Sequence, residues 1–361
     1  MQEDRRLRRV RLYTAFGEAS RRPRRCSRAL PAAIVALGCL ALAVVAWIVV
    51  VAAHGGCTPV VVELDWSYST QFAGILQAVH QGHYRDNGLC VTLKPNPATE
   101  RDVIAAVVAH PGVSIGLSEG APLLKAASEG VELVAVASML QSTPLGWMAL
   151  GRHRDCAAVR CMNRSTVAIH PDGSLALDVA LGRSGLTRAD VEVVSAPASL
   201  TPLLNGTVDW MQGYVFDEYV SLRAADANAT ITLAADHGDG SYAEVLFTTA
   251  DVLRNSPDAI GAFVDATRLG WFRAASHEDE TVELLWRRYD ATHATARDVL
   301  AAQLRAVLRL VMPPGAGSGA GVSGRPLARM RLARWEDEQR QLLRHGLIAR
   351  AVDLSKVVVS L

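Results

Sequence analysis

The chain has 361 residues, enough for two or three domains, and its balance of hydrophobic (50%) and charged (20%) residues is that of an ordinary globular protein. The net charge of +1 hides an uneven distribution, because residues 1–28 hold ten arginines against three acids while the remainder carries 27 basic and 33 acidic residues. The basic part is therefore a tail, and the acidic body gives no reason to expect binding to nucleic acid.

An uncharged segment, residues 29–53, follows the basic tail of residues 1–28 and reads ALPAAIVALGCLALAVVAWIVVVAA. It is long enough for a helix that crosses roughly 30 Å of hydrocarbon. The preceding arginines predict a cytoplasmic tail and a body outside the cell or in a lumen. We expect a single-pass signal anchor. A cleaved signal peptide is the alternative, although the apolar run exceeds the usual h-region of about 7–15 residues.

Four cysteines lie beyond this segment, at Cys57, Cys90, Cys156 and Cys161. Cys57 and Cys90 each open a predicted strand, and one helix joins the two strands, so the strands should be parallel neighbours with their starts side by side. That arrangement predicts a Cys57–Cys90 disulfide. Cys156 and Cys161 close a short loop and form the second predicted pair. Four unrelated reduced thiols remain the alternative.

Strands and helices alternate along the first part of the chain, as hydrophobic periodicity and glycine stops indicate. The predicted strands are 60–66, 89–95, 113–120 and 132–141, and the predicted helices are 70–88, 100–112 and 121–130. This alternation predicts an α/β domain with a mainly parallel sheet.

The alternation repeats in a second unit and then gives way to helices. Strands are expected at 144–152, 165–173, 191–197, 208–215 and 231–236, with helices at 174–185, 200–206 and 216–226. Strand 243–250 leads back, and helices follow at 258–276, 279–289, 294–311 and 328–346. We therefore expect a first lobe (57–145), a second lobe (146–245) and a return (246–361), with a hinge and a ligand-binding cleft between the lobes.

Several segments in this order carry a family resemblance. They are ELDWSYSTQFAGILQAVHQGHYRDNGLCVTL, VSIGLSEG, VELVAVASMLQSTPLG, LLNGTVDWMQGYVFDE, AFVDATRLGWFRAA and WEDEQRQLLRHGLI. Together they resemble the nitrate/sulfonate/taurine-type solute-binding proteins of ABC transporters, and within these the NMT/THI-like branch of thiamine-pyrimidine-precursor binders and synthases. The resemblance covers residues 60–361 and implies a type II periplasmic-binding-protein fold.

The synthase of that branch makes the thiamine pyrimidine from pyridoxal phosphate and a histidine, with iron. It needs a lysine and a histidine just after its third strand, where this chain has Ser118 and Pro122. Lys125 could substitute only if the alignment were shifted. The Cys-rich motif of the synthase corresponds here to residues 241–245, which contain no cysteine. These departures argue against catalysis, so we expect no catalytic residue, no metal site and no cofactor outside the synthase alternative.

Three candidate ligand-binding residues follow the first predicted strand. Trp66 could stack on a planar heterocycle, or it could be a core residue beneath the following helix. Asp65 could accept hydrogen bonds from ring amino groups or cap that helix. Tyr68 is a candidate second wall of the cleft.

Further candidates follow the third and fourth strands. Ser118 and Glu119 precede a helix, where backbone N–H groups attract anions; Glu119 would repel an anion and so favours a neutral or cationic ligand. Gln141 can both donate and accept, which suits an amide or pyrimidine edge. Solvated loop positions are the alternative for Ser118 and Glu119.

The second lobe contributes candidates at two predicted helix starts. Asp172, Gly173 and Ser174 begin one helix, where a structural cap is the alternative role. Tyr214 could stack on the ligand from the opposite lobe, and Glu218 could pair with an amino group.

These observations predict a membrane-anchored solute-binding protein that captures a small planar nitrogenous heterocycle for an ABC-type permease or for sensing. A thiamine-pyrimidine precursor is the best single candidate. A synthase-like enzyme using iron and pyridoxal phosphate, and an ectodomain that acts only through interactions, are the alternatives.

Overall fold

The computed structural model describes residues 56–97, 101–151, 158–170, 173–197, 199–226, 228–290, 292–312 and 327–361. Residues 57–361 form one compact unit, to which the following description applies. The predicted tail (1–28) and membrane segment (29–53) lie outside the described residues, as do Cys156 and Asp172. Among the described helices, none combines the length and apolar character that a membrane crossing requires.

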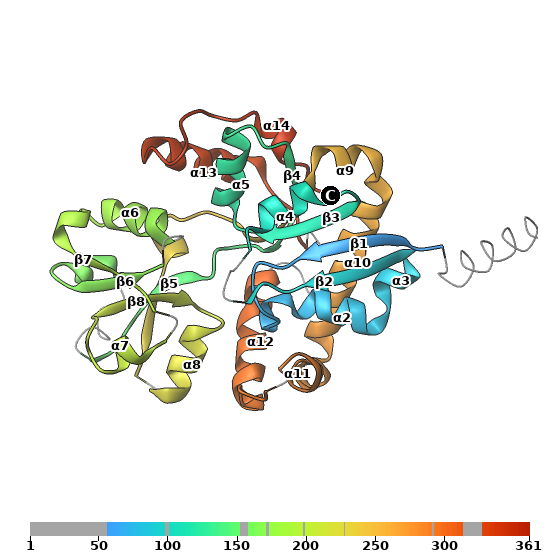
Figure 1. Cartoon of the computed structure of the whole chain (residues 1–361). Coiled ribbons are helices and arrows are strands. Elements are labelled where there is room, and N and C mark those ends of the chain that lie inside the picture. The colour runs from blue at the N-terminus through green and yellow to red at the C-terminus, as the bar shows by residue number, and fades with distance from the viewer. Residues whose placement is uncertain are drawn as a thin grey trace, which may run out of the picture. The chain divides into compact units, whose positions relative to one another are not determined.

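The first lobe is built on a five-stranded sheet in the order β2-β1-β3-β10-β4 (Figure 1). Strands β1 (Thr58–Glu63), β2 (Leu89–Lys94) and β3 (Val113–Ser118) pair in parallel, with β1 in the middle of the three. Strand β10 (Ala243–Thr249) runs antiparallel between β3 and β4 (Leu133–Leu140).

The second lobe contains another five-stranded sheet, in the order β7-β6-β8-β5-β9. Strand β6 (Thr166–Ile169) pairs in parallel with β7 (Glu192–Ser195) and β8 (Trp210–Tyr214), whereas β5 (Leu145–Ala149) runs antiparallel to β8 and to β9 (Thr230–Leu233). Helices α6 (Ser174–Arg183), α7 (Thr201–Leu204) and α8 (Glu218–Ala225) complete this lobe.

The expectation of a mainly parallel sheet is confirmed, because four of the five strands in each sheet run in the same direction. One strand in each sheet, β10 in the first and β5 in the second, runs against its neighbours. The cause is the double crossing between the lobes. Strand β10 enters the first sheet from the edge at which β1 and β3 end, so it must run in the opposite direction, and β5 enters the second sheet in the corresponding way.

The predicted helix 70–88 is divided into three pieces. A 3-10 turn, η1 (Thr70–Phe72), leads into α2 (Ala73–Gln81), and α3 (His83–Asp86) follows. Gly82 separates α2 from α3 with φ +80°, a backbone conformation that glycine adopts without steric cost. The N–H of Gly82 bonds the last carbonyls of α2, so this glycine ends the helix.

Helix α2 packs closely against α10 (Pro257–Ser276), which explains why Gly74 is a glycine. A Cβ atom at Gly74 would lie 2.3 Å from the fully buried ring of Trp271, and a Cβ at Gly270 would lie 1.9 Å from the carbonyl oxygen of Gly74. The two glycines therefore allow the helices to approach, and the Trp271 ring fills the space that remains.

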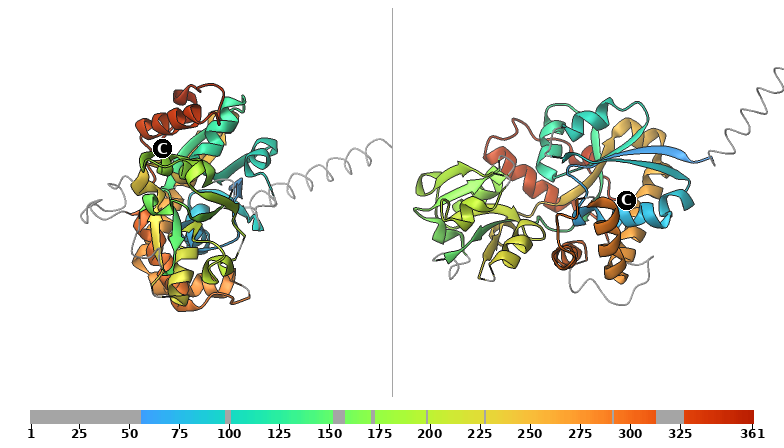
Figure 2. Two further views of the ribbon diagram at one scale, coloured as in Figure 1. Left: turned by 90° about the vertical axis from the view of Figure 1, so that its left-hand side faces the viewer. Right: turned by 60° about the horizontal axis from the view of Figure 1, so that its bottom comes forward.

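The remaining helices cover the first sheet. They are α4 (Val103–Ala109), α5 (Gly120–Ser128), α9 (Ala250–Asn255), α11 (Glu278–Leu284) with its π turn η8 (Leu285–Tyr289), α12 (Arg297–Val311), α13 (Leu332–Arg344) and α14 (Leu354–Val357). Helix α13 packs on α5 and on α14, so the C-terminal segment belongs to the first lobe (Figures 1 and 2).

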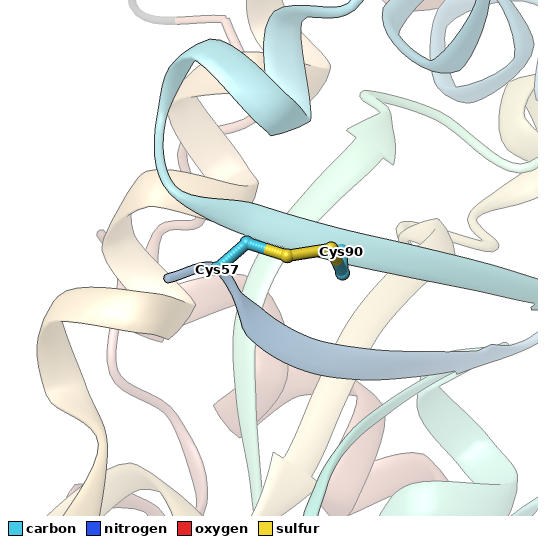
Figure 3. Close-up of a disulfide and its surroundings, with 2 residues drawn as sticks. All are labelled: Cys57 and Cys90. Atoms are coloured by element: carbon cyan, nitrogen blue, oxygen red, sulfur yellow. A yellow bond between two sulfur atoms is a disulfide. The ribbon is translucent and has the colours of Figure 1, made fainter. Parts of the chain in front are cut away.

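The predicted disulfide between Cys57 and Cys90 is confirmed. It joins the starts of β1 and β2, whose register pairs Thr58 with Leu89, and its Cα atoms are 5.5 Å apart (Figure 3). Cys161 is also disulfide-bonded. Its predicted pairing with Cys156 stays a prediction.

Arg334 on α13 joins the two segments that cross between the lobes. Its guanidinium donates to the carbonyl oxygens of Gly240 and Ser241 in the second crossing, at 2.7 and 2.9 Å, and to that of Gln141 in the first crossing, at 2.7 Å. The same guanidinium lies 3.7 Å from the ring centroid of Tyr242. One side chain thus fixes both hinge segments to the first lobe.

Candidate functional site

A cavity of about 460 Å³ lies between the two lobes, beside the second crossing. Its walls come from the N-terminal turns of α5 and α6, the end of β8, the crossing segment 239–241 and helix α13. The described residues that line it are Glu119, Ala121, Pro122, Lys125, Thr143, Leu145, Ser174, Leu175, Ala176, Val179, Tyr214, Asp239, Gly240, Ser241, Glu338, Gln341, Leu342 and Leu347.

The cavity combines apolar walls with acidic groups. Leucine, alanine, valine and proline side chains from α5, α6 and α13 supply most of the surface, which suits the faces of a flat ring. Three carboxyl groups reach it, those of Glu119, Asp239 and Glu338, against one cation, Lys125, among the described lining residues. The electrostatic balance therefore favours ligands with N–H donors or positive charge over anions.

Glu338 is the most deeply buried of these acids, with 7% of its surface exposed. Burial raises the pKa of its carboxyl to about 8, and the nearby carboxylates of Asp239 and Asp337 act in the same direction, while Arg334 opposes them. Its Oε2 has no hydrogen-bond partner among the described residues.

A second cluster of acidic side chains, Asp65, Glu119 and Glu244, lies where β1 ends and β10 begins. The side-chain amide of Gln71 donates to Oε1 of Glu244 at 3.0 Å and to Oδ1 of Asp65 at 3.3 Å. Burial raises the pKa of Asp65 to about 6 and that of Glu244 well above its usual range, and the negative charges of Asp65 and Glu119 raise the pKa of Glu244 further. Three carboxyl groups thus converge at the carboxyl edge of the first sheet.

Glu244 is held in an uncommon backbone conformation. Its φ is +50°, which non-glycine residues rarely adopt and which costs roughly 1–3 kcal/mol. Its Oε2 is buried and has no partner among the described residues. Strain and an unsatisfied carboxyl oxygen in the strand that returns from the second lobe mark this position as a functional candidate.

Two hydrogen bonds connect the lobes across this edge. The hydroxyl of Tyr214, at the end of β8, donates to Oε1 of Glu119 at 3.3 Å. The amide of Gln303 on α12 donates to Oδ1 of Asp217 at 2.7 Å. Burial, together with the neighbouring charge of Glu218, raises the pKa of Asp217 to about 6. Acidic side chains of both lobes, Glu119 of the first and Asp217 of the second, therefore take part in these contacts.

Of the residues predicted from the sequence to bind ligand, three line the cavity: Glu119, Ser174 and Tyr214. The capping role considered for Ser174 is wrong, because Gly173 occupies the N-cap of α6 and no side chain of the described residues caps this helix. The hydroxyl of Ser174 accepts instead from the guanidinium of Arg188 at 2.7 Å. This bond fixes the first turn of α6 at the cavity wall.

Asp65, Trp66 and Tyr68 are not among the described lining residues. The alternative of a core residue is wrong for Trp66, whose side chain is 40% exposed. Asp65 caps no described helix, since the turn that follows begins at Ser69 without a side-chain cap. Tyr68 packs at an angle on Tyr289, with 4.9 Å between ring centroids. Their binding roles stay predictions.

The other predicted residues have structural contacts of their own. Ser118 ends β3, opposite Val245. The amide of Gln141 donates back to the carbonyl of Ser138 at 2.8 Å. Gly173 lies against Gln212, and Glu218 accepts from the backbone N–H of Tyr214 at 2.8 Å. Asp172 lies outside the described residues.

Sequence reasoning missed Glu338, Asp239, Glu244 and Gln71. Glu338 sits in a helix rich in charge, where it cannot be told from its solvated neighbours by pattern. Only its position, three residues after the fully buried Trp335 and on the same face, indicates burial. Within the described ranges, no three His, Cys, Asp or Glu side chains converge as a metal site.

Comparisons with known proteins agree with this architecture. The family model described as NMT1/THI5 like matches residues 69–281. The riboflavin-binding protein RibY of Chloroflexus aurantiacus is 27% identical over 231 residues, which are 62% of this chain and 65% of RibY. The aligned region therefore spans slightly less than two thirds of that relative.

Solved structures share the fold at low identity. The periplasmic aliphatic sulphonate binding protein SsuA of Escherichia coli superposes with a TM-score of 0.63 at 15% identity, over 83% of this chain and 91% of SsuA. The desulfurization enzyme DSZB superposes with a TM-score of 0.55 at 15% identity, over 83% of this chain and 96% of DSZB. The periplasmic-binding-protein fold is therefore confirmed. Because both a binding protein and an enzyme share it, the fold does not decide function.

Proposed function

Because the chain belongs to the NMT1/THI5-like family, we propose that it is a solute-binding protein whose two lobes close around a small, planar, nitrogen-rich solute. The observation that carries this proposal is the interlobe cavity, which is lined by apolar side chains from both lobes and by carboxyl groups. A volume of about 460 Å³ lies within the roughly 300–1,000 Å³ range of small-molecule sites.

The chemistry of the walls supports a heterocycle. Leu145, Leu175 and Leu342 offer surfaces for ring faces, and Tyr214 supplies an aromatic edge. Glu119, Asp239 and Glu338 are acceptors for ring and amino N–H groups. The named ligand of the relative RibY is riboflavin, a planar nitrogen heterocycle. A thiamine-pyrimidine precursor, which is smaller, is our preferred solute for this chain.

The proposed setting is the outer or luminal face of a membrane. Residues 29–53 would anchor the protein and residues 1–28 would remain in the cytoplasm. The Cys57–Cys90 disulfide supports an oxidising compartment. In this setting the protein would pass its solute to an ABC-type permease or act as a sensor.

Calorimetry and thermal unfolding of the full-length protein in detergent test the proposal. The ligands are hydroxymethylpyrimidine, riboflavin and an aliphatic sulfonate. We expect at least one heterocycle to bind, and at about 100 times its Kd to add roughly 2.7 kcal/mol to the free energy of unfolding. If neither heterocycle binds, or if the sulfonate binds more tightly than both, the proposal is wrong.

A matched pair of variants locates the site. Leu175→Trp places a large ring in the cavity and should abolish binding, since Leu175 lines its wall. Leu204→Trp makes the same replacement at an exposed position of α7 in the same lobe, where the side chain is 50% exposed. Binding by Leu204→Trp should equal that of the wild type. Equal binding by Leu175→Trp would place the solute elsewhere.

A further inference from the structure

Glu338 reaches the interlobe cavity from α13 as a buried acid with an unsatisfied oxygen. Only 7% of the residue is exposed, and Oε2 has no hydrogen-bond partner among the described residues. A buried polar atom without a partner costs roughly 1–3 kcal/mol, and more if it is charged. Native proteins rarely keep such an atom unless a ligand or a water molecule satisfies it.

The cations nearest to Glu338 do not neutralise it. The guanidinium of Arg334, one turn earlier on α13, already donates to three backbone carbonyls and stacks on Tyr242. Lys125 lies in the same cavity wall, but no ion pair joins it to Glu338 among the pairs of the described residues. Asp239 and Asp337 carry charge of the same sign as an ionised Glu338 carboxylate, so they repel that carboxylate.

The carboxyl of Glu338 is held in position by the start of α5. A Cβ atom at Gly120, the first residue of that helix, would lie 2.5 Å from Oε2 and 2.8 Å from Oε1 of Glu338. The carboxyl therefore occupies space that any larger residue at position 120 would fill. It is confined between α5 and α13, and Glu338 lines a cavity that can hold a small molecule.

We propose that Glu338 is a specificity-determining residue that accepts a hydrogen bond from the exocyclic amino group of the solute. This inference rests on the proposed function. It narrows the solute to a basic, amino-bearing heterocycle, and it makes the carbonyl-bearing analogue and anionic compounds poor ligands. Glu119 and Asp239, in the same walls, add to the rejection of anions.

The test measures selectivity between two pyrimidines that differ at one group. The probes are hydroxymethylpyrimidine, which carries a ring amino group, and its deaminated analogue, which carries a carbonyl and a ring N–H. Calorimetry gives the ratio of their Kd values for the full-length wild type and for Glu338→Gln. A glutamine amide keeps the shape but adds a donor, which suits the carbonyl of the analogue.

We expect the wild type to prefer the amino compound. In Glu338→Gln the preference should fall by about 10- to 100-fold, because an amide whose N–H groups donate to the carbonyl of the analogue replaces the carboxyl acceptor of the amino group. Glu336→Gln is the matched control, because Glu336 is exposed on the same helix. Its selectivity should stay within about twofold of wild type, since its side chain reaches no ligand.

Each outcome decides between the alternatives. An unchanged ratio in Glu338→Gln overturns the role of Glu338, and so does a wild type that does not bind the amino compound. Riboflavin binding in the latter case would leave the proposed function in place. If Glu338→Gln does not fold, Glu338→Asp withdraws the carboxylate by one methylene while keeping its charge, and it must also lower the ratio.

Discussion

Arg334 and Glu338 lie one turn apart on α13. The side chain of Arg334 has several hydrogen-bond partners, whereas one carboxyl oxygen of Glu338 has none among the described residues. The guanidinium of Arg334 donates to three backbone carbonyls in the segments that cross between the lobes. Oε2 of Glu338 is buried and has no partner among the described residues. One helix therefore carries both a structural clamp on the hinge and an unsatisfied acceptor at the cavity.

Replacing Arg334 by alanine should destabilise the whole unit. The change removes three hydrogen bonds from a charged donor and the stacking on Tyr242, and it leaves crossing-segment carbonyls without partners. We expect a loss of about 3 kcal/mol in the free energy of unfolding, measured by urea denaturation. Arg340→Ala removes an exposed arginine from the same helix and should cost less than about 1 kcal/mol. Similar losses in the two variants would show that Arg334 clamps nothing.

The raised pKa values of the buried acids predict how stability changes with pH. A carboxyl whose pKa is higher in the folded state binds more protons there, so its contribution to stability is present at low pH and is lost as pH rises towards the folded pKa. Asp65 and Asp217, raised from 3.8 to about 6, act between about pH 4 and 6. Glu338, raised from 4.5 to about 8, continues the loss to about pH 8.

Urea denaturation at pH 5, 6, 7 and 8 checks this expectation. Between pH 6 and 8 the wild type should lose on the order of a few kcal/mol through Glu338 and Glu244, whose pKa values are both raised. The charged groups that face the Glu338 carboxyl are Asp239, Asp337 and Arg334. Glu338→Gln removes one of the two carboxyl groups with raised pKa values, so it should reduce the slope of the curve between pH 6 and 8 and leave the part that Glu244 contributes. A wild-type slope that persists in this variant would assign the effect to another group.

The order of the helices and strands could be predicted from sequence, because apolar periodicity and glycine stops are local signals. The mainly parallel direction of the strands could be predicted, but that of β10 and β5 could not, since both have the composition of parallel strands and only the double crossing reverses them. The local residue pattern of a strand does not indicate from which edge the chain enters the sheet, so it does not predict the direction of the strand.

The candidate site was predictable in part, for a related physical reason. Glu119, Ser174 and Tyr214 follow strands or start helices, and such positions converge in an α/β fold. Glu338 and Asp239 come from the C-terminal helix and from a crossing segment, which reach the cavity only after the chain has returned to the first lobe. Trp66 also follows a strand, but it is 40% exposed and is not among the described residues that line the cavity.

The Cys57–Cys90 disulfide should contribute substantially to stability. It closes a loop with a sequence separation of 33 residues, and the loop-entropy model gives about 3–4 kcal/mol for that length. The free energy of unfolding of the double variant Cys57→Ser/Cys90→Ser, measured by urea denaturation, should therefore be lower than that of the wild type by about 3–4 kcal/mol. Reducing agent should lower the free energy of unfolding of the wild type in the same way. In the double variant it has no Cys57–Cys90 bond to break, so the loss due to this bond should be absent. A double variant as stable as the oxidised wild type would mean that strain in the disulfide offsets its entropic benefit.

Gly120 gives an independent way to move the carboxyl of Glu338 without changing that residue. A Cβ atom at position 120 would lie 2.5 Å from Oε2 of Glu338, too close for any real contact, so Gly120→Ala must displace the carboxyl. The displaced group is the end of a side chain, and alanine favours the helical conformation of α5, so the net cost in stability should stay near 1 kcal/mol. Selectivity between the amino and the deaminated pyrimidine should fall as in Glu338→Gln.

Gly182→Ala is the matched control for this substitution. Gly182 lies within α6, and a Cβ atom there would meet no atom within 4 Å. The exchange should raise the free energy of unfolding by up to about 1 kcal/mol through helix propensity alone, with ligand selectivity unchanged. Wild-type selectivity in Gly120→Ala, together with a lower melting temperature, would mean that the contact between Gly120 and Glu338 serves packing only. The carboxyl of Glu338 would then not determine selectivity from that position.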